Sequence, residues 1–424
     1  MTLRFRLNAM MFLEYAVKGL WFPLAGFFLT VALSDGGLGF TQSEKGLIIG
    51  IPMAIGAIGA PFIAQICDRY LPTEKILAVL LFFTGIIKII LSYQTTFSGW
   101  MGFSIAFTIL YLPTVSLTNS LAMRHLKDPK TQFPGVRVWG TISWIAVGWG
   151  FSMIWLQHDL QLQWLPPFLK GTEHADITAR MLDSLKIAGV LCMIYSVFCW
   201  FVLPPTPPVA NQTKKIVLIE ALSLLRKRSF ATLMLCGLAI ATIHTIYFFQ
   251  MAPFLKANGL DQSDIMPAMS IGQFSEIAVM GILGLCLSKF GYRTVITFGA
   301  LAYALRYGIC SVTDLPLSAY IGAQVIHGFC FAGFFAAAFI YVDRVAPPQI
   351  KNSAQTLFML VMLGIGPLAA SWLNGYLSEV IGENTKEISI AGFAFFWKVN
   401  AIIALVTAIV FAVFFRDETV ESER

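Results

Sequence analysis

The chain has 424 residues, of which 57% are hydrophobic and only 12% are charged, and its mean hydropathy is +0.74. These values lie far outside the range of soluble globular domains, so they exclude a soluble enzyme or binding module. The formal net charge is +6 at pH 7, which in a soluble protein would suggest an acidic partner such as nucleic acid.

Apolar runs of about 20 residues recur along the whole chain, and a helix of that length crosses roughly 30 Å of hydrocarbon. Barrel strands would alternate over about ten residues, and that alternation is absent. The first run carries Glu14 and Lys18 and no small-residue cleavage site follows it, so we expect no cleaved signal peptide. We expect an all-α membrane protein with twelve transmembrane helices at 10–33, 44–66, 74–94, 98–122, 134–156, 184–203, 230–255, 264–287, 293–312, 316–341, 352–378 and 390–415.

The basic residues fall in alternate loops, for example at Arg124 and Arg226, whereas the intervening loops hold mainly acids such as Asp35 and Asp261. This pattern follows the positive-inside rule and places both termini in the cytoplasm. The excess charge therefore reflects topology and does not indicate a nucleic-acid partner. The seven cysteines lie almost all within the apolar runs and form no CxxC pair, so we expect neither disulfides nor a metal site, and no cofactor.

A proline-rich, basic stretch at 203–215 interrupts the apolar pattern, and an amphipathic segment follows at 216–230. We expect a six-helix bundle over 1–203, a cytoplasmic linker over 204–229 and a second six-helix bundle over 230–424. The two halves echo each other, since short basic turns at 67–70 and 287–293 follow the second helix of each half. Such duplication is typical of secondary transporters. The loop at 157–183 is either an external cap or a tolerated insertion.

Charged residues inside the expected spans need a partner, a cavity or a route to the headgroups. Glu14 and Lys18 are spaced i,i+4, so they form an ion pair or line a cavity together. Lys88 and Lys398 lie near the outer ends of their spans, and we expect both to snorkel. Arg306 lies in mid-span, where we expect a bond to a helix end or a carboxylate.

Glu276 lies near the centre of its span, with Gln273 one turn earlier on the same face. A membrane carboxyl is far cheaper when neutral, so Glu276 either carries a proton between the two sides or is a permanently protonated or ion-paired structural residue. Other candidates are polar or aromatic residues of the seventh and tenth spans, and each is either functional or a packing residue. They are Thr245, Tyr247 and Phe248 for the solute, and His244 and His327 for proton coupling.

Arg137 lies one turn inside the fifth span, and Thr141 and Trp144 follow on the same face. A cation, a hydroxyl and a ring in one stripe suit a polar solute that contains a flat ring. The alternative is that Arg137 snorkels to the cytoplasmic headgroups.

Several segments together resemble the bacterial nucleoside:proton symporters of the major facilitator superfamily, namely FPGVRVWGTISW at 133–144, GQFSE at 272–276, LSKFGYR at 287–293, LAYALRYG at 301–308 and NSAQTLFML at 352–360. The resemblance implies a major facilitator fold with central-cavity roles for Arg137, Thr141, Gln273 and Glu276, and an aromatic cavity position for Trp144. Two positions depart from the family pattern. The family's polar pair in the seventh span aligns with Thr245 and Phe248, and its acid in the tenth span aligns with Ala332.

The resemblance implies a monomeric importer of nucleosides in the bacterial inner membrane that works by proton symport and alternating access. One alternative is a permease of the same fold for a sugar, an aromatic acid or a modified nucleoside. Another is an uncoupled nucleoside facilitator, which Ala332 motivates. The sequence holds no nucleophile–base motif, metal-ligand cluster or phosphate loop, so we do not expect an enzyme.

Overall fold

The computed structural model describes residues 1–164, 166–208, 222–347, 351–385 and 387–417, so the linker residues 209–221 lie outside it. The helices are α1 (Leu3–Gly19), α2 (Phe22–Phe28), α3 (Gln42–Tyr70), α4 (Thr73–Leu91), α5 (Phe97–His125), α6 (Pro129–Ile154), α7 (Ile177–Phe201), α9 (Arg228–Ala257), α10 (Ile265–Cys310), α11 (Leu317–Gly322), α12 (His327–Cys330), α13 (Ala337–Val345), α14 (Lys351–Leu360), α15 (Gly366–Val380) and α16 (Ile390–Phe414). Short 3₁₀ or π turns are η1 (Leu33–Asp35), η2 (Ser223–Arg226), η3 (Gln262–Asp264), η4 (Ala323–Ile326), η5 (Phe331–Ala336) and η6 (Val361–Ile365), and the strands are β1 (Gln157–Leu162) and β2 (Leu169–Glu173).

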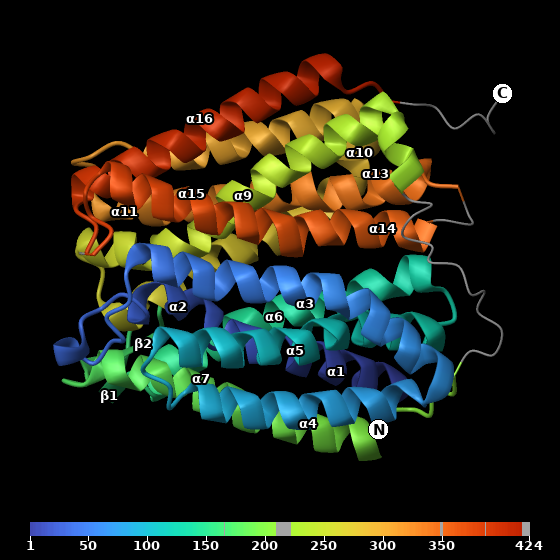
Figure 1. The fold of residues 1–424 in the computed structure, drawn as a ribbon, viewed down its shortest axis with the longest axis horizontal. Coiled ribbons are helices and arrows are strands. Elements are labelled where there is room, and N and C mark those ends of the chain that lie inside the picture. The colour runs from blue at the N-terminus through green and yellow to red at the C-terminus, as the bar shows by residue number, and fades with distance from the viewer. Residues whose placement is uncertain (165, 209–221, 348–350, 386, 418–424) are drawn as a thin grey trace.

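The long helices run side by side along the longest axis of the molecule (Figure 1). The β1–β2 hairpin and the short helices α2 and α11 lie at one end, which we call the hairpin end. The C-terminus lies at the opposite end. The pre-linker helices α1–α7 occupy the lower part of this view, and the post-linker helices α9–α16 occupy the upper part.

Among the described residues, eight helical stretches are long and apolar enough to cross a membrane. They are Gln42–Phe62, Phe97–His125, Ile177–Phe201, Arg228–Ala257, Gln262–Cys310, Leu317–Val345, Ala354–Val380 and Ile390–Phe414. Three expected spans are not among these eight stretches. They are 10–33, 74–94 and 134–156, which fall on α1 with α2, on α4 and on α6. These helices are too short, too weakly apolar or too charged to be identified as spans by length and composition.

Two expected spans share the single helix α10, because the connection between them is only one residue long. Gly291 has φ 73° and ψ 167°, a backbone conformation that breaks the helix into two limbs. Only glycine adopts this conformation without strain. The turn needs no separate loop, which explains why the two spans merge into 46 helical residues.

The first expected span is not one continuous helix. Helix α1 ends at Gly19, and α2 begins at Phe22 with Pro23 in its first turn. Proline is favoured there because its missing N–H would have no helical partner.

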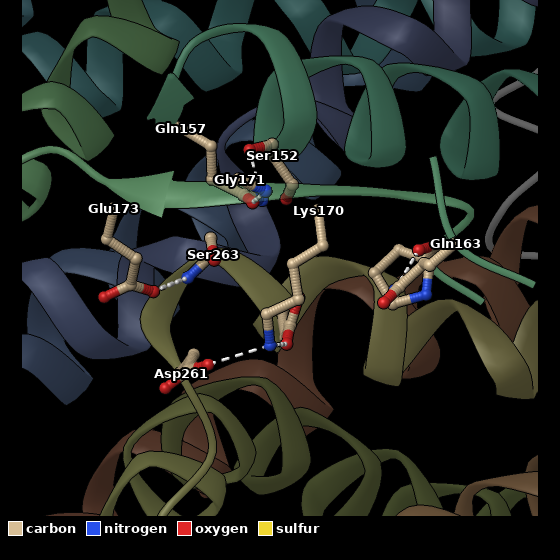
Figure 2. Close-up of polar contacts among 10 residues, drawn as sticks. Ser152, Gln157, Gln163, Lys170, Gly171, Glu173, Asp261 and Ser263 are labelled. Atoms are coloured by element: carbon tan, nitrogen blue, oxygen red, sulfur yellow. Dashed lines mark hydrogen bonds and ion pairs between the residues drawn. The ribbon is translucent and has the colours of Figure 1, made fainter. Parts of the chain in front are cut away.

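The loop at 157–183 forms an antiparallel hairpin in which Gln157 pairs with Glu173 and Leu162 with Leu169. The hairpin is tied to η3 of the post-linker region (Figure 2). Lys170 Nζ lies 2.9 Å from Asp261 Oδ2 and 2.8 Å from Asp264 Oδ2.

The backbone N–H of Ser263 adds a hydrogen bond of 2.8 Å to Glu173 Oε1 (Figure 2). The hydrogen bonds to Asp264 and Asp261 raise the pKa of Lys170 above its ordinary value. These contacts favour the expected cap over a tolerated insertion.

Helix α10 and the π turn η5 pack with their backbones in contact. A Cβ atom added to Gly299 would lie 2.5 Å from the carbonyl carbon of Gly333 and 2.5 Å from the nitrogen of Phe334. Because both neighbours are main-chain atoms, no side chain can move aside. Close approach of this kind is how helices associate in a membrane, where the hydrophobic effect does not drive them together.

We therefore expect Gly299→Ala to lower the thermal unfolding midpoint of the detergent-solubilised protein, because overpacking costs about 1–3 kcal/mol. The control is Gly308→Ala on the same limb, where an added Cβ meets no atom within 4 Å. That variant should keep or raise the midpoint, since alanine is favoured over glycine in a helix by about 1 kcal/mol. Equal midpoints for the two variants would contradict the close backbone contact.

Candidate functional site

Helices α6 and α10 bring a cation, a hydroxyl and a carboxyl together. The Glu276 carboxyl lies near the Thr141 hydroxyl and the Arg137 guanidinium, and both groups act on it electrostatically. Arg137 lies 4.0 Å from the centre of the Tyr15 ring of α1. All four side chains are half-buried. The guanidinium is therefore held among helices, which argues against snorkelling.

An aromatic wall adjoins these polar groups. The rings of Trp144 (α6) and Phe248 (α9) meet edge-to-face with centroids 6.4 Å apart. The ring of Phe22 of α2 also contacts Phe248, with ring centroids 4.9 Å apart. Gly19 leaves room for Trp144, because an added Cβ would lie 3.2 Å from the indole ring. Rings from the pre-linker and post-linker helices thus form one surface.

Gln273 is buried, and its Oε1 atom has no hydrogen-bond partner among the described residues. A buried amide oxygen without a partner is costly, so it indicates a place for a ligand or water. We call the group of Arg137, Thr141, Trp144, Phe248, Gln273 and Glu276 the central site.

The two histidines that the sequence suggests for proton coupling lie beside each other. The His244 and His327 rings stack on each other with centroids 5.7 Å apart. His244 Nδ1 lies 2.9 Å from the Tyr303 hydroxyl, and His327 Nδ1 lies 2.9 Å from an Arg306 nitrogen. A guanidinium can only donate, so His327 Nδ1 accepts and this ring nitrogen carries no proton.

Arg306 is fully buried, and its partners differ from those expected. Besides His327 it donates to Gln324 Oε1, and its guanidinium lies 4.2 Å from the centre of the Tyr247 ring. No carboxylate lies within ion-pair distance of it among the described residues. The expected bond to a helix end or a carboxylate is therefore wrong, and neutral groups solvate this charge.

Two of the residues expected to bind solute in the seventh span are buried and bond to other groups. Thr245 donates its hydroxyl to the carbonyl of Ala241, one turn earlier in the same helix. Tyr247 is buried against Arg306 and bonds Gln324 at 3.3 Å. Of the expected residues in this span, Phe248 and His244 are half-buried.

Glu14 and Lys18 do not form the expected ion pair. The Glu14 carboxyl is fully buried and accepts hydrogen bonds from Thr114 at 2.8 Å and Thr118 at 3.1 Å. Lys18 instead lies with Nζ 4.6 Å from the centre of the Phe22 ring. The i,i+4 spacing gives both residues one face, but the hydroxyls of α5 draw the carboxyl aside.

The two lysines expected to snorkel differ from each other. Lys398 is exposed on α16, as snorkelling requires. Lys88 is 0% exposed, and Nζ lies 3.0 Å from the centre of the Trp21 ring. The expectation for Lys88 is wrong because the side chain points into the pre-linker helices.

Lys45 is a residue that the sequence analysis missed. It is fully buried, and Nζ donates to the Phe249 carbonyl at 3.1 Å, to Gln250 Oε1 at 3.4 Å and to the Gly26 carbonyl at 3.5 Å. Gln250 in turn donates to Asn374 Oδ1 at 2.6 Å. A lysine in the first turn of a helix resembles a surface charge, so the sequence carried no signal for this bridge.

The chain matches the family described as Nucleoside H+ symporter over residues 1–420. The candidate nucleoside transporter YegT of Escherichia coli (strain K12) is 31% identical over 422 residues, which cover 97% of this chain and 93% of that protein. Xanthosine permease of the same strain is 23% identical, covering 97% and 95%. Nucleoside permease NupG of that strain is 24% identical, covering 98% and 96%.

A crystal structure of nucleoside transporter NupG has a TM-score of 0.81 at 21% identity, and the match covers 99% of this chain and 100% of that one. A POT family transporter in complex with 5-aminolevulinic acid has a TM-score of 0.72 at 13% identity, covering 97% and 95%. These neighbours share the fold, and they are transporters rather than enzymes. Because the family match spans nearly the whole chain and identity to YegT reaches 31%, the chain belongs to the Nucleoside H+ symporter family and is a multi-pass membrane transporter of the major facilitator fold.

Proposed function

We propose that this protein imports nucleosides across the bacterial cytoplasmic membrane together with protons. The observation that carries the proposal is the placement of Glu276 beside Arg137 and Thr141, where α6 and α10 meet. This carboxyl lies between the pre-linker and post-linker helices, so a proton on it can face either side as the two parts move. His327 is bonded to Arg306, and we therefore leave the proton role to Glu276.

The central site suits a nucleoside chemically. A flat base can stack against Trp144 and Phe248, since aromatic faces prefer offset or edge contacts with other rings. The amide of Gln273 can both donate to and accept from a base edge, and its Oε1 atom is free to do so. The Thr141 hydroxyl and the Arg137 guanidinium suit the hydroxyls of the ribose.

We propose that the chain crosses the membrane twelve times, in two bundles at 1–203 and 230–424 joined by the linker at 204–229. The break at Gly291 supports two passes within α10, and α1 with α2, α4 and α6 supply the passes that apolarity alone does not identify. The basic loops support a cytoplasmic location for both termini and an outer location for the hairpin end. We propose that the monomer is the working unit.

Alternating access requires the two bundles to separate at one end while they meet at the other. At the hairpin end they meet through buried polar contacts. Lys45 bridges α2 and α9, the Ser43 hydroxyl lies 2.9 Å from Asn384 Oδ1, and Ser371 donates to the Gly46 carbonyl at 2.6 Å. We infer that the structure represents the state in which the outer route is shut.

An uncoupled facilitator is the second candidate. Ala332, at the position of the family's acid, is fully buried in the π turn η5, so no carboxyl stands there. If proton coupling needs two carboxyls, this chain lacks one at that place.

Uptake into proteoliposomes tests the proposal. Labelled uridine and adenosine should accumulate when the proton gradient is directed inward, because each charge that moves through 100 mV gains about 2.3 kcal/mol, or roughly 50-fold in concentration. Equal inside and outside concentrations, whatever the gradient, would identify the facilitator. No uptake by folded protein would point to another solute, such as a sugar or an aromatic acid.

Two carboxyls within the helices, at Glu276 and Glu14, provide a matched test of proton coupling. We expect Glu276→Gln to abolish accumulation against a gradient while nucleoside exchange continues, because glutamine keeps the shape but cannot carry the proton. Glu14→Gln should still accumulate nucleoside, since Glu14 faces the Thr114 and Thr118 hydroxyls rather than the central site. Normal accumulation by the Glu276 variant would remove this residue from the coupling mechanism.

A cross-link tests alternating access. We expect the double variant Ser43→Cys/Asn384→Cys to lose uptake on oxidation and to regain it on reduction, because a disulfide would hold the hairpin end shut. Either single variant under the same oxidant is the control. Full uptake by protein whose cross-link is verified by mass spectrometry would contradict movement at this end.

A further inference from the structure

A cavity lies among the pre-linker helices, and none of the residues of the central site lines it. Its volume is about 40 Å³, enough for a few water-sized groups. The residues that matter here are Lys18, Trp21, Lys88, Ser104, Phe107 and Tyr111, and we call this space the lysine cavity. Phe22 also lines it and contacts Phe248, so the cavity adjoins the aromatic wall of the central site.

Lys88 has no hydrogen-bond partner for Nζ among the described residues, although its side chain is 0% exposed. The ammonium lies 3.0 Å from the centre of the Trp21 ring and 4.1 Å from that of Phe107. Rings attract a cation, but by far less than the loss of hydration costs a buried ammonium. A bound anion would therefore not have to displace any hydrogen bond that Nζ makes to the described residues.

Lys18 is the second lysine that lines this cavity, and its Nζ lies 4.6 Å from the centre of the Phe22 ring. It has no carboxylate within ion-pair distance in the described part of the chain. The nearest acid along its helix, Glu14, is held by Thr114 and Thr118. Neither lysine is neutralised by its own helix.

Two hydroxyls around the cavity are already engaged, whereas the Trp21 indole N–H has no hydrogen-bond partner among the described residues. The Thr108 hydroxyl donates to the Pro52 carbonyl at 2.7 Å, and the Tyr111 hydroxyl donates to the Glu14 carbonyl at 2.7 Å. The lining residues from α3 are Ile48, Ile49, Pro52 and Met53, which are apolar. The buried Cys192 thiol of α7 also lies near Lys88. The cavity thus combines two lysines with aromatic walls, and no acidic residue lines it in the described part of the chain.

We propose that the lysine cavity binds a small anion, which is either a carboxylate carried by the transported solute or a free monovalent ion such as chloride. A carboxylate oxygen accepts hydrogen bonds from an ammonium group, and charge-assisted bonds of this kind are short and strong. A solute whose ring lies between Trp144 and Phe248 could extend its acidic group past Phe22 into the cavity. The solute form rests on the proposed nucleoside transport, whereas the free-ion form does not.

The test uses the purified full-length protein and two matched ligands. Adenosine 5′-carboxylate and adenosine 5′-carboxamide have nearly the same shape but differ in charge, and calorimetry measures their dissociation constants. A second arm compares thermal unfolding in sodium chloride and in sodium gluconate, whose anion is too large for the cavity. Each arm is run on the wild type, on Lys88→Met and on the control Lys398→Met, which removes an exposed lysine.

The wild type should bind the carboxylate at least about tenfold more tightly than the carboxamide, and Lys88→Met should lose that preference while the Lys398 variant keeps it. Absence of this preference together with chloride stabilisation that Lys88→Met abolishes would identify a free ion as the occupant. Binding of adenosine with neither effect in the wild type would overturn the proposal and leave nucleoside transport intact. If no nucleoside binds, the proposed function fails, and the chloride arm alone decides whether the cavity is an anion site.

Should Lys88→Met not fold, the wild-type comparisons still decide the matter, and Lys18→Met replaces it as the variant. If the wild type binds both adenosine ligands equally and chloride does not raise its unfolding midpoint, the proposal fails and Lys88 is only a packing residue.

Discussion

A charged group inside hydrocarbon must find an oxygen, a ring or water, and this constraint arranges the interior of the protein. Each buried charge meets it differently. Lys45 uses main-chain carbonyls, Arg306 uses a neutral imidazole and an amide, and Glu14 uses two hydroxyls. Lys88 has only rings. A charged side chain that has all its polar partners holds helices to each other. A charged side chain that lacks such partners can bind a ligand.

The central site and the hairpin-end contacts are built from neighbouring residues of the same two helices. On α9, Phe248 belongs to the aromatic wall, and the next residues, Phe249 and Gln250, bond to Lys45. On α2, Phe22 contacts Phe248, and one turn later Gly26 touches the α9 main chain, where an added Cβ would lie 2.5 Å from two carbonyl oxygens. A solute that separates the Phe22 and Phe248 rings therefore moves α2 and α9 apart. The same movement acts directly on the contacts of these two helices at the hairpin end.

Much of this arrangement could be predicted from the sequence. The stripe of Arg137 and Thr141, and the mid-span position of Glu276, predicted groups that the structure brings together. Spacing along a helix shows which residues share a face, but it does not show which neighbouring helix supplies their partner. For this reason the ion pair of Glu14 with Lys18, one of the two alternatives from their spacing, does not form.

The wrong predictions for Arg306 and Lys88 have the same cause. The carboxylate expected for Arg306 is absent among the described residues because His327, Gln324 and Tyr247, which approach from other helices, take its place. Lys88 lies near a helix end, and only the packed structure shows that its side chain turns inward. The break after Gly19 and the merging of two spans at Gly291 depend on local backbone geometry, which apolarity does not report.

The contact between the hairpin and η3 has a consequence for the medium in which the protein works. Lys170 is 37% exposed and pairs with Asp261 and Asp264 across the boundary between the bundles. Exposed pairs weaken as dissolved ions screen them, over about 10 Å at 0.1 M and about 3 Å at 1 M. The balance between the shut and open forms of this end therefore shifts with the ionic strength of the surroundings, and it does so without any change in the solute.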